Sequence, residues 1–179
     1  GTVIRATYVV ECLVGVGAFG AVYRVRHRFL GTQAMKVFHQ GQGAPTPEEL
    51  IEEARILSTL VHPNIVRLFE ANTLDVMPGE RPYLTMEYIS SGNLEAVLER
   101  RVRLHPLSAL KTTRQVCSGL AVAHRTQPPI VHRDITARNL LVYGFSAHGT
   151  PQVKVGDFGL AKHVDPDSLM TRPAGTVAY

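Results

Sequence analysis

The sequence has 179 residues, 45% of them hydrophobic, so it can bury a core and has the composition of a globular protein. Its 19 basic and 15 acidic residues give a formal net charge of +4 and are spread along the chain, which gives no indication of nucleic-acid binding. The apolar runs are shorter than the ~18 residues that a membrane-spanning helix needs, and residues 1–12 lack the features of a signal peptide. We therefore expect neither nucleic acid nor a membrane as a partner of this segment.

The two cysteines, Cys12 and Cys117, lie far apart in apolar surroundings and lack the spacing of metal ligands. They are predicted to be buried free thiols, which suits a reducing, cytoplasmic compartment. A disulfide between the two is the alternative.

The first half of the chain is predicted to consist mainly of strands. Partly alternating or β-branched runs indicate strands over residues 8–14, 21–28 and 33–38, with further strand-like runs at 65–69 and 83–88. A loop rich in Gly and Pro over residues 41–47 leads into one helix, predicted over residues 48–60. Its apolar residues recur at helical spacing: Leu50, Ala54, Leu57 and Leu60.

The second half is predicted to be mainly helical. The polar segment that ends in Gly92 and Asn93 breaks the strand pattern and indicates a domain boundary, with one domain over residues 1–89 and another over 90–179. Helices are predicted over 94–100 and 107–124, and residues 145–152 form a connection between two short apolar runs. One buried stripe is expected along the longer helix, from Leu110, Val116, Leu120 and Ala123.

A glycine-rich run follows the first predicted strand, with the sequence Gly15, Val16, Gly17, Ala18, Phe19 and Gly20. The pattern is weak by itself, because dinucleotide-binding proteins use a nearly identical spacing. In those proteins the glycines open a helix, whereas here a strand is predicted directly after them. The run therefore favours a hairpin that covers a triphosphate with its backbone amides, and a dinucleotide-dependent oxidoreductase is the weaker alternative.

Further motifs follow in a fixed order. They are Ala34-Met35-Lys36, then Glu53, then His132-Arg133-Asp134 with Asn139, and finally Asp157-Phe158-Gly159. Together with the glycine run, they resemble the catalytic domain of eukaryotic-type protein kinases over nearly the whole chain. The resemblance implies an α+β fold with an antiparallel sheet and one main helix in a first lobe, followed by a mostly helical second lobe. It also implies ATP and Mg²⁺ as cofactors and a protein as substrate.

The resemblance assigns a chemical role to each of these residues. Lys36 contacts the α- and β-phosphates, and Glu53 pairs with it, although Glu49 and Glu52 on the same helix compete for that role. Asp134 orients the substrate hydroxyl and accepts its proton. Asn139 and Asp157 hold magnesium, and Arg138 takes the place of a lysine near the γ-phosphate.

Other positions match the family's nucleotide pocket and its internal packing. The residues expected beside adenine are Val22, Ala34 and Leu141, with Met86 as gatekeeper and with Glu87, Ile89 and Asn93 in the connecting segment. The family's stack of side chains that links the lobes is matched by Leu57, Leu68, His132 and Phe158. For these four residues, and for His124, the expected role is packing and not ligand binding.

The specificity signals are mixed. Thr136, Ala137 and Arg138 resemble tyrosine-specific kinases, whereas the run from Gly175 to Tyr179 resembles Ser/Thr-specific ones. The mixture resembles the tyrosine-kinase-like group and favours Ser/Thr, because the platform near the substrate governs the choice more directly. Ser168 and Thr171 are candidate phosphorylation sites whose phosphate would pair with Arg133.

A pseudokinase or scaffold is the main rival function. Lys36, Asp134, Asn139 and Asp157 are all present, so loss of activity would have to come from Thr136 at the usual lysine position. The sequence ends at Tyr179, before the Ala-Pro-Glu that normally closes the family's activation segment. We therefore expect a truncated second lobe that leaves an apolar face of the helix 107–124 uncovered, and low activity of the fragment by itself.

Overall fold

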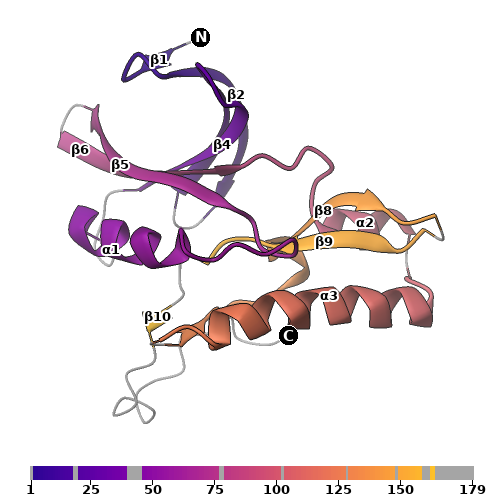
Figure 1. Cartoon of the computed structure of the whole chain (residues 1–179). Coiled ribbons are helices and arrows are strands. Elements are labelled where there is room, and N and C mark those ends of the chain that lie inside the picture. Colours follow the sequence, from indigo (N-terminus) through magenta and orange to yellow (C-terminus); the bar gives the residue numbers. More distant parts are fainter. Residues whose placement is uncertain are drawn as a thin grey trace. The chain divides into compact units, whose positions relative to one another are not determined.

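The computed structural model describes residues 2–17, 20–39, 46–76, 79–101, 103–127, 129–147, 149–158 and 162–163 (Figure 1). The chain forms two compact units. The first comprises Gly1–Thr59 with Arg67–Tyr88, and the second comprises Leu60–Val66 with Ile89–Tyr179. Residues 60–66 were expected in the first domain, but their backbone pairs with the second unit through Val66 and Val155.

The first unit contains one antiparallel sheet in the order β1-β2-β3-β4-β6-β5, as predicted for the kinase-like fold. Figure 1 shows how strongly this sheet curls, with β1 and β2 turning over the other strands. The strands are β1 (Val3–Ile4), β2 (Tyr8–Gly17), β3 (Gly20–His27), β4 (Gly31–Phe38), β5 (Leu68–Val76) and β6 (Gly79–Glu87).

Helix α1 (Pro47–Leu57) covers one face of this sheet. Leu50 and Ala54 on the helix are buried against Phe38 of β4 and Leu84 of β6, and Met86 packs against the same cluster. The predicted stripe is therefore correct for Leu50, Ala54 and Leu57. The predicted end of the helix at residue 60 was wrong, because α1 ends at Leu57 and Leu60 lies beyond it. The contact of this cluster with two neighbouring strands fixes the helix on the face from which Lys36 also projects.

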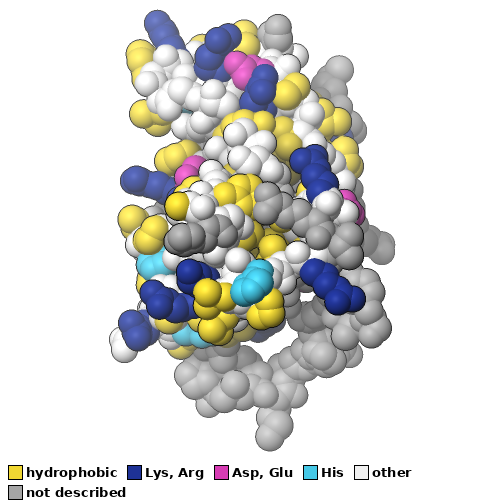
Figure 2. Space-filling model, turned by 90° about the vertical axis from the view of Figure 1, so that its right-hand side faces the viewer, with side chains coloured by type: hydrophobic (Ala, Val, Ile, Leu, Met, Phe, Trp, Pro, Cys, Tyr) yellow, Lys and Arg dark blue, Asp and Glu magenta, His cyan; other side chains and the backbone are white. Residues whose placement is uncertain are grey.

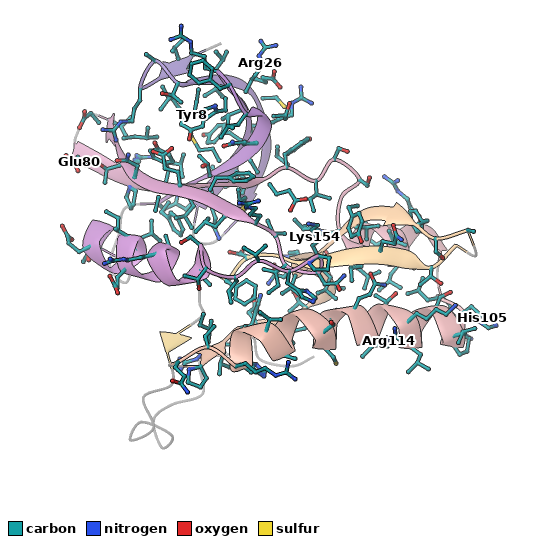
Figure 3. All side chains as sticks on the ribbon, in the orientation of Figure 1. Tyr8, Arg26, Glu80, His105, Arg114 and Lys154 are labelled. Carbon is teal, nitrogen blue, oxygen red and sulfur yellow. The ribbon has the colours of Figure 1, made fainter. Side chains whose placement is uncertain are left out.

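The other face of the sheet encloses a second core with a polar centre. Tyr8, whose position inside the curl is visible in Figure 3, and Tyr83 both donate hydrogen bonds to the carboxylate of Glu70, and so does Asn72. Burial and Glu70 together raise the pKa of Tyr83 to about 12 and shift the pKa of Tyr8 further upward. Burial also acts to raise the pKa of Glu70, but the hydrogen bonds from the three side chains outweigh it and lower that pKa.

The predicted strand at 65–69 was misplaced. Strand β5 begins only at Leu68 and continues to Val76, and β6 begins at Gly79 instead of 83. The missed part of β5 contains Asn72, Thr73 and Asp75, which are polar and weaken the sequence signal of a strand. In the structure, the polar side chains of this strand join the Glu70 cluster or face solvent.

The described residues of the second unit form two α-helices, two pairs of antiparallel strands and one 3₁₀ turn. Its elements are α2 (Leu94–Arg101), α3 (Pro106–His124), β7 (Ile130–Val131), the 3₁₀ turn η1 (Ala137–Asn139), β8 (Leu140–Phe145), β9 (Pro151–Val155) and β10 (Lys162–His163). Strands β8 and β9 form an antiparallel hairpin that packs on α3, and β7 pairs with β10. The two helices agree with the prediction to within one residue at each end.

The buried stripe of α3 differs from the prediction. Val116 and Ala123 are buried as expected, but Leu110 is 66% exposed. The helix instead buries small residues, which are Ser108, Thr112, Val116, Gly119 and Ala123. A Cβ on Gly119 would lie 2.9 Å from the carbonyl oxygen of Asn64, so close packing of this segment requires small side chains.

The prediction that both cysteines are buried was wrong. Cys12 and Cys117 are free and exposed. Cys12 lies in the exposed second part of β2, which begins at Glu11. Cys117 lies on the side of α3 that faces away from the hairpin β8–β9. No helix among the described residues is long and apolar enough to cross a membrane.

Candidate active site

His132 is the centre of the candidate site in the second unit. Its side chain is 2% exposed and packs against Phe158, with the ring centroids 4.5 Å apart and the ring planes tilted by 59°. The backbone N–H of Asp134 donates to Nδ1 at 3.3 Å, so the ring proton lies on Nε2, which donates to the carbonyl oxygen of Gly156 at 2.9 Å. The imidazole therefore connects the loop that carries Asp134 with the residue before Asp157.

The ionisation of His132 supports this positioning role. Burial lowers the pKa of its imidazole, although the hydrogen bond to Gly156 and the nearby carboxylates of Asp157 and Asp134 oppose the shift. A neutral ring can keep Nδ1 as an acceptor, whereas a charged ring cannot. This arrangement is suited to a fixed packing residue and not to a proton carrier, as the sequence predicted.

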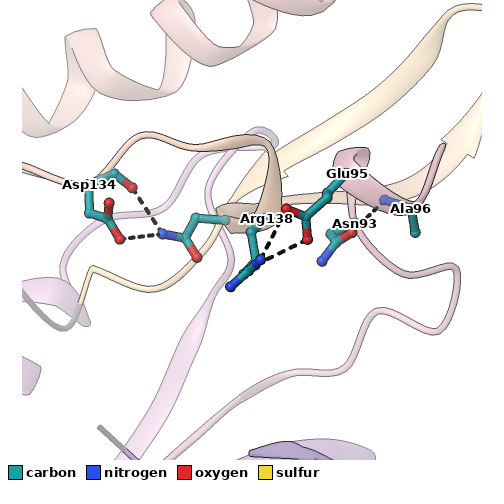
Figure 4. A network of polar contacts seen from close by, with 6 residues as sticks. Asn93, Glu95, Ala96, Asp134 and Arg138 are labelled. Carbon is teal, nitrogen blue, oxygen red and sulfur yellow. Dashed lines mark hydrogen bonds and ion pairs between the residues drawn. The ribbon is translucent and has the colours of Figure 1, made fainter. Parts of the chain in front are cut away.

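Asn139 holds the side chain of Asp134 directly. Its amide nitrogen donates to the main-chain oxygen of Asp134 and to the carboxylate atom Oδ2, both at 2.9 Å (Figure 4). The amide therefore turns its oxygen away from Asp134. The main-chain oxygen of Asn139 also accepts the N–H of Gly156 at 2.8 Å, so the end of β9 is joined to this turn.

Two non-glycine residues of the site have left-handed backbone conformations. Arg133 has φ of 66° and Asp157 has φ of 55°. Each such residue costs on the order of 1–3 kcal/mol and persists only where surrounding contacts impose it. Both flank the pair of His132 and Phe158, which supplies those contacts. As a result, Asp157 is exposed directly between two buried neighbours, Gly156 and Phe158.

Arg138 faces helix α2. Its Nε and Nη2 atoms donate to the carboxylate of Glu95, both at 3.1 Å, in a bidentate pair drawn in Figure 4. The pair is exposed, with 71% of the arginine side chain accessible. Asn93, which was expected to contact nucleotide, accepts the N–H of Ala96 and so caps α2. Sequence analysis missed Glu95, because an acidic residue in the first turn of a helix is ordinary.

Lys36 in the first unit is 8% exposed, and its Nζ lies 5.3 Å from the centroid of the Phe38 ring. Strand pairing sets it opposite Val22 on β3 and Leu84 on β6. Ala34, on the same face of β4, is buried opposite Met86. The predicted adenine residues of this unit thus share one sheet face with the lysine.

The glycines of the loop differ in their surroundings. A Cβ on Gly20 would lie only 2.3 Å from the carbonyl oxygen of Val37. On Gly17 it would approach the oxygen of Gly20 at 3.9 Å, and on Gly15 it would meet no described atom within 4 Å. Gly20 is therefore required for the packing of β3 against β4. At Gly15 and Gly17 the protein itself leaves room for a side chain, so a ligand that approaches the backbone is the reason for glycine that remains there.

Several predicted site residues lie outside the described part of the structure. They are Ala18, Phe19, the side chains of Glu49 and Glu53, Gly159, Ser168, Thr171 and residues 175–179. The competitor Glu52 is exposed, opposite the buried side of α1. The pairing of Glu53 with Lys36 therefore stays a prediction. Glu87 and Leu141 are described, and both keep their backbone in strand pairing.

A curled antiparallel sheet that carries a buried lysine, and a helical unit in which an Asn fixes an Asp beside a strained second Asp, have the features of nucleotide-dependent phosphotransferases. Comparison with known families agrees with this class. The chain belongs to the protein kinase domain family, whose sequence model matches residues 8–179.

Individual relatives are similar over nearly the whole chain. Serine/threonine-protein kinase ATG1a of Arabidopsis thaliana is 34% identical over 93% of this chain and 26% of its own length. Serine/threonine-protein kinase A of Synechocystis sp. is 34% identical over 93% of this chain and 34% of its own. Human mitogen-activated protein kinase kinase kinase 10 is 34% identical over 94% and 18%, respectively. The chain thus spans about a third or less of these three relatives.

Proposed function

We propose that this chain is the nucleotide-binding and catalytic portion of an active protein kinase that transfers the γ-phosphate of ATP to a serine or threonine hydroxyl of a protein. The observation that supports the proposal best is the pair of hydrogen bonds from Asn139 to Asp134. This pair places a carboxylate and an amide oxygen in one fixed turn. Phosphoryl transfer requires mainly such positioning and neutralisation of charge.

Asp134 is the proposed catalytic residue. One carboxylate oxygen is held by Asn139, so the carboxylate has a defined orientation toward a substrate hydroxyl, whose proton it accepts. His132 is proposed as a positioning residue, because its Nδ1 atom accepts the backbone N–H of Asp134. In the first unit, Lys36 would neutralise phosphate charge.

The residues present fit a magnesium ion. Mg²⁺ prefers oxygen ligands and keeps several waters, so one carboxylate and one amide oxygen suffice as protein ligands. Asp157 and the amide oxygen of Asn139, which is turned away from Asp134, would hold it. Bound magnesium would neutralise the phosphate oxygens during transfer.

The Ser/Thr preference is part of the proposal. Two of the similar proteins described above are named serine/threonine-protein kinases. The tyrosine-like feature, Arg138, is engaged by Glu95 at the exposed edge of the turn. A cytoplasmic location is proposed as well, because exposed free thiols such as Cys12 and Cys117 are typical of a reducing compartment.

The test is transfer of labelled γ-phosphate to a protein substrate by the full-length protein. Asp134→Asn and Lys36→Ala should each reduce kcat/KM by roughly 100-fold or more. The exposed Asp75→Asn and Lys111→Ala are matched controls and should retain activity. Phosphoamino-acid analysis of the product then distinguishes Ser/Thr from Tyr.

Each outcome has a defined meaning. Activity that survives both substitutions at Asp134 and Lys36 would refute the mechanism. Mainly phosphotyrosine in the product would refute the Ser/Thr preference alone. Nucleotide binding without any transfer by the wild type would favour the scaffold function.

A further inference from the structure

The turn between β3 and β4 holds two large apolar side chains in solvent. Phe29 is 79% exposed and the adjacent Leu30 is 66% exposed. Single exposed apolar residues are ordinary on soluble proteins, but two neighbours at the end of one hairpin form a patch that calls for a partner. The proposed kinase activity does not use either residue.

The turn is built to hold these side chains outward. The Nδ1 atom of His27 accepts the backbone N–H of Phe29 at 3.0 Å and that of Leu30 at 3.1 Å. Gly31 closes the turn with φ of 80°. The N–H of Arg28 donates to the carbonyl oxygen of Thr7 at 2.8 Å, which ties the turn to the β1–β2 connection. Because these bonds already order the backbone, little entropy remains to be lost on binding.

A positively charged side chain lies beside the two apolar side chains. The guanidinium of Arg28 lies 5.3 Å from the centroid of the Phe29 ring, and Arg28 is exposed. Arg5, which is exposed in the neighbouring turn, donates hydrogen bonds to Asn72 and to the carbonyl oxygen of Thr73. Arg26, with 63% of its side chain accessible, pairs with Glu11 at 3.6 Å. Figure 2 shows lysine and arginine side chains among apolar ones on one face of the molecule. The exposed Arg28 beside Phe29 and Leu30 complements a negatively charged surface that accepts apolar groups.

We propose that the β3–β4 tip, defined as Arg28, Phe29 and Leu30, binds an anionic membrane surface. Phe29 and Leu30 enter the boundary between headgroups and acyl chains, and the arginine contacts lipid phosphate. A bilayer accepts protruding apolar side chains without a matching pocket, whereas a protein partner has to supply one. The contact is peripheral, and it differs from the expectation based on sequence, which had considered only spanning segments.

Vesicle flotation of the chain tests the proposal. The wild type should float with phosphatidylcholine vesicles that contain phosphatidylserine, and much less with phosphatidylcholine alone. The double variant Phe29→Ser/Leu30→Ser should bind at least about tenfold more weakly. Arg28→Glu should weaken binding at low salt and reduce its dependence on salt. Val61→Ser and Arg100→Glu, which change an exposed valine and an exposed arginine outside the tip, should bind like the wild type.

Thermal melting of every variant shows whether it is folded, and if the double variant is not, the Arg28→Glu and salt results decide. Wild-type protein that stays unbound to both vesicle types at low salt would overturn the proposal. Equal losses in the tip and control variants would overturn it too. If Phe29→Ser instead abolishes concentration-dependent dimerisation without lipid, the tip is an interface between two copies and the membrane assignment is wrong.

Discussion

Replacement of Gly20 by alanine should destabilise the first unit through a clash with the neighbouring strand. The added Cβ would lie 2.3 Å from the oxygen of Val37 and 3.1 Å from the Cα of Phe38. Both are backbone atoms in the β3–β4 ladder, so they cannot rotate away as a side chain could. The two strands would have to separate by about 1 Å to restore ordinary contact.

The expected magnitude follows from two opposing effects. Overpacking costs about 1–3 kcal/mol, and the change from Gly to Ala within a strand returns about 0.5–1 kcal/mol through the lower entropy of the unfolded chain. The net loss is about 1 kcal/mol from the middle of both ranges and about 2.5 kcal/mol at most. For a chain of this size each kcal/mol lowers Tm by about 2–4 °C.

Gly15→Ala is the matched control, because its Cβ would meet no described atom within 4 Å. Thermal unfolding followed by circular dichroism should show a lower Tm for Gly20→Ala only. The Tm of Gly15→Ala should stay near that of the wild type. This variant should nevertheless bind a fluorescent ATP analogue more weakly, because its Cβ would keep phosphate away from the backbone. Equal Tm values for the two variants would refute the packing argument.

Three further predictions concern buried hydrogen bonds and backbone strain. His132→Phe should cost about 1–3 kcal/mol, because Gly156 and the loop lose their partner. It should also remove a pH dependence of the free energy of unfolding. The pKa of His132 in the folded protein lies below its ordinary 6.5, so this contribution to wild-type stability is full above pH 6.5 and is lost as the pH falls through the folded pKa. Urea unfolding at several pH values measures the difference. Tyr8→Phe should lower the free energy of unfolding by about 1.5–3 kcal/mol at neutral pH and raise the pKa of Glu70, because the carboxylate loses a hydrogen bond. An unchanged urea midpoint would contradict a stabilising role of this hydrogen bond. Asp157→Gly should relieve backbone strain of about 1 kcal/mol or more, so the urea midpoint of unfolding should rise. The same substitution should abolish phosphate transfer.

The sequence predicted most of the secondary structure because its periodic patterns were strong. The helix later described as α1 was anticipated from Leu50 and Ala54, which do pack on the sheet. Strand β5 was misplaced since its polar residues serve a buried carboxylate, Glu70, and such a cluster has no local signature. The stripe of α3 was misjudged because tight packing selected Gly119 over larger apolar residues.

The contacts within the candidate site could not be predicted from the sequence, and the roles of its residues remain predictions. Ordered motifs were enough to select Asp134 and Asn139, while the hydrogen bonds between them and the tautomer of His132 depend on three-dimensional geometry. The Arg138–Glu95 pair joins residues 43 positions apart, so no spacing rule reveals it. The exposed tip at Phe29 was equally hidden, because a hydrophobic residue in a sequence is expected to be buried until its exposure is known.

The strain at Asp157 also explains what the hydrogen-bond network is for. A glycine would adopt the same backbone conformation without cost, so an aspartate at this position is accounted for only by its carboxylate. The network around it opposes the strain: Gly156 is bonded at both its N–H and its carbonyl oxygen, and Phe158 is buried against His132. These contacts therefore hold the carboxylate of Asp157, the proposed magnesium ligand, in a backbone conformation that it would not adopt by itself, and we expect weaker contacts to lower turnover first.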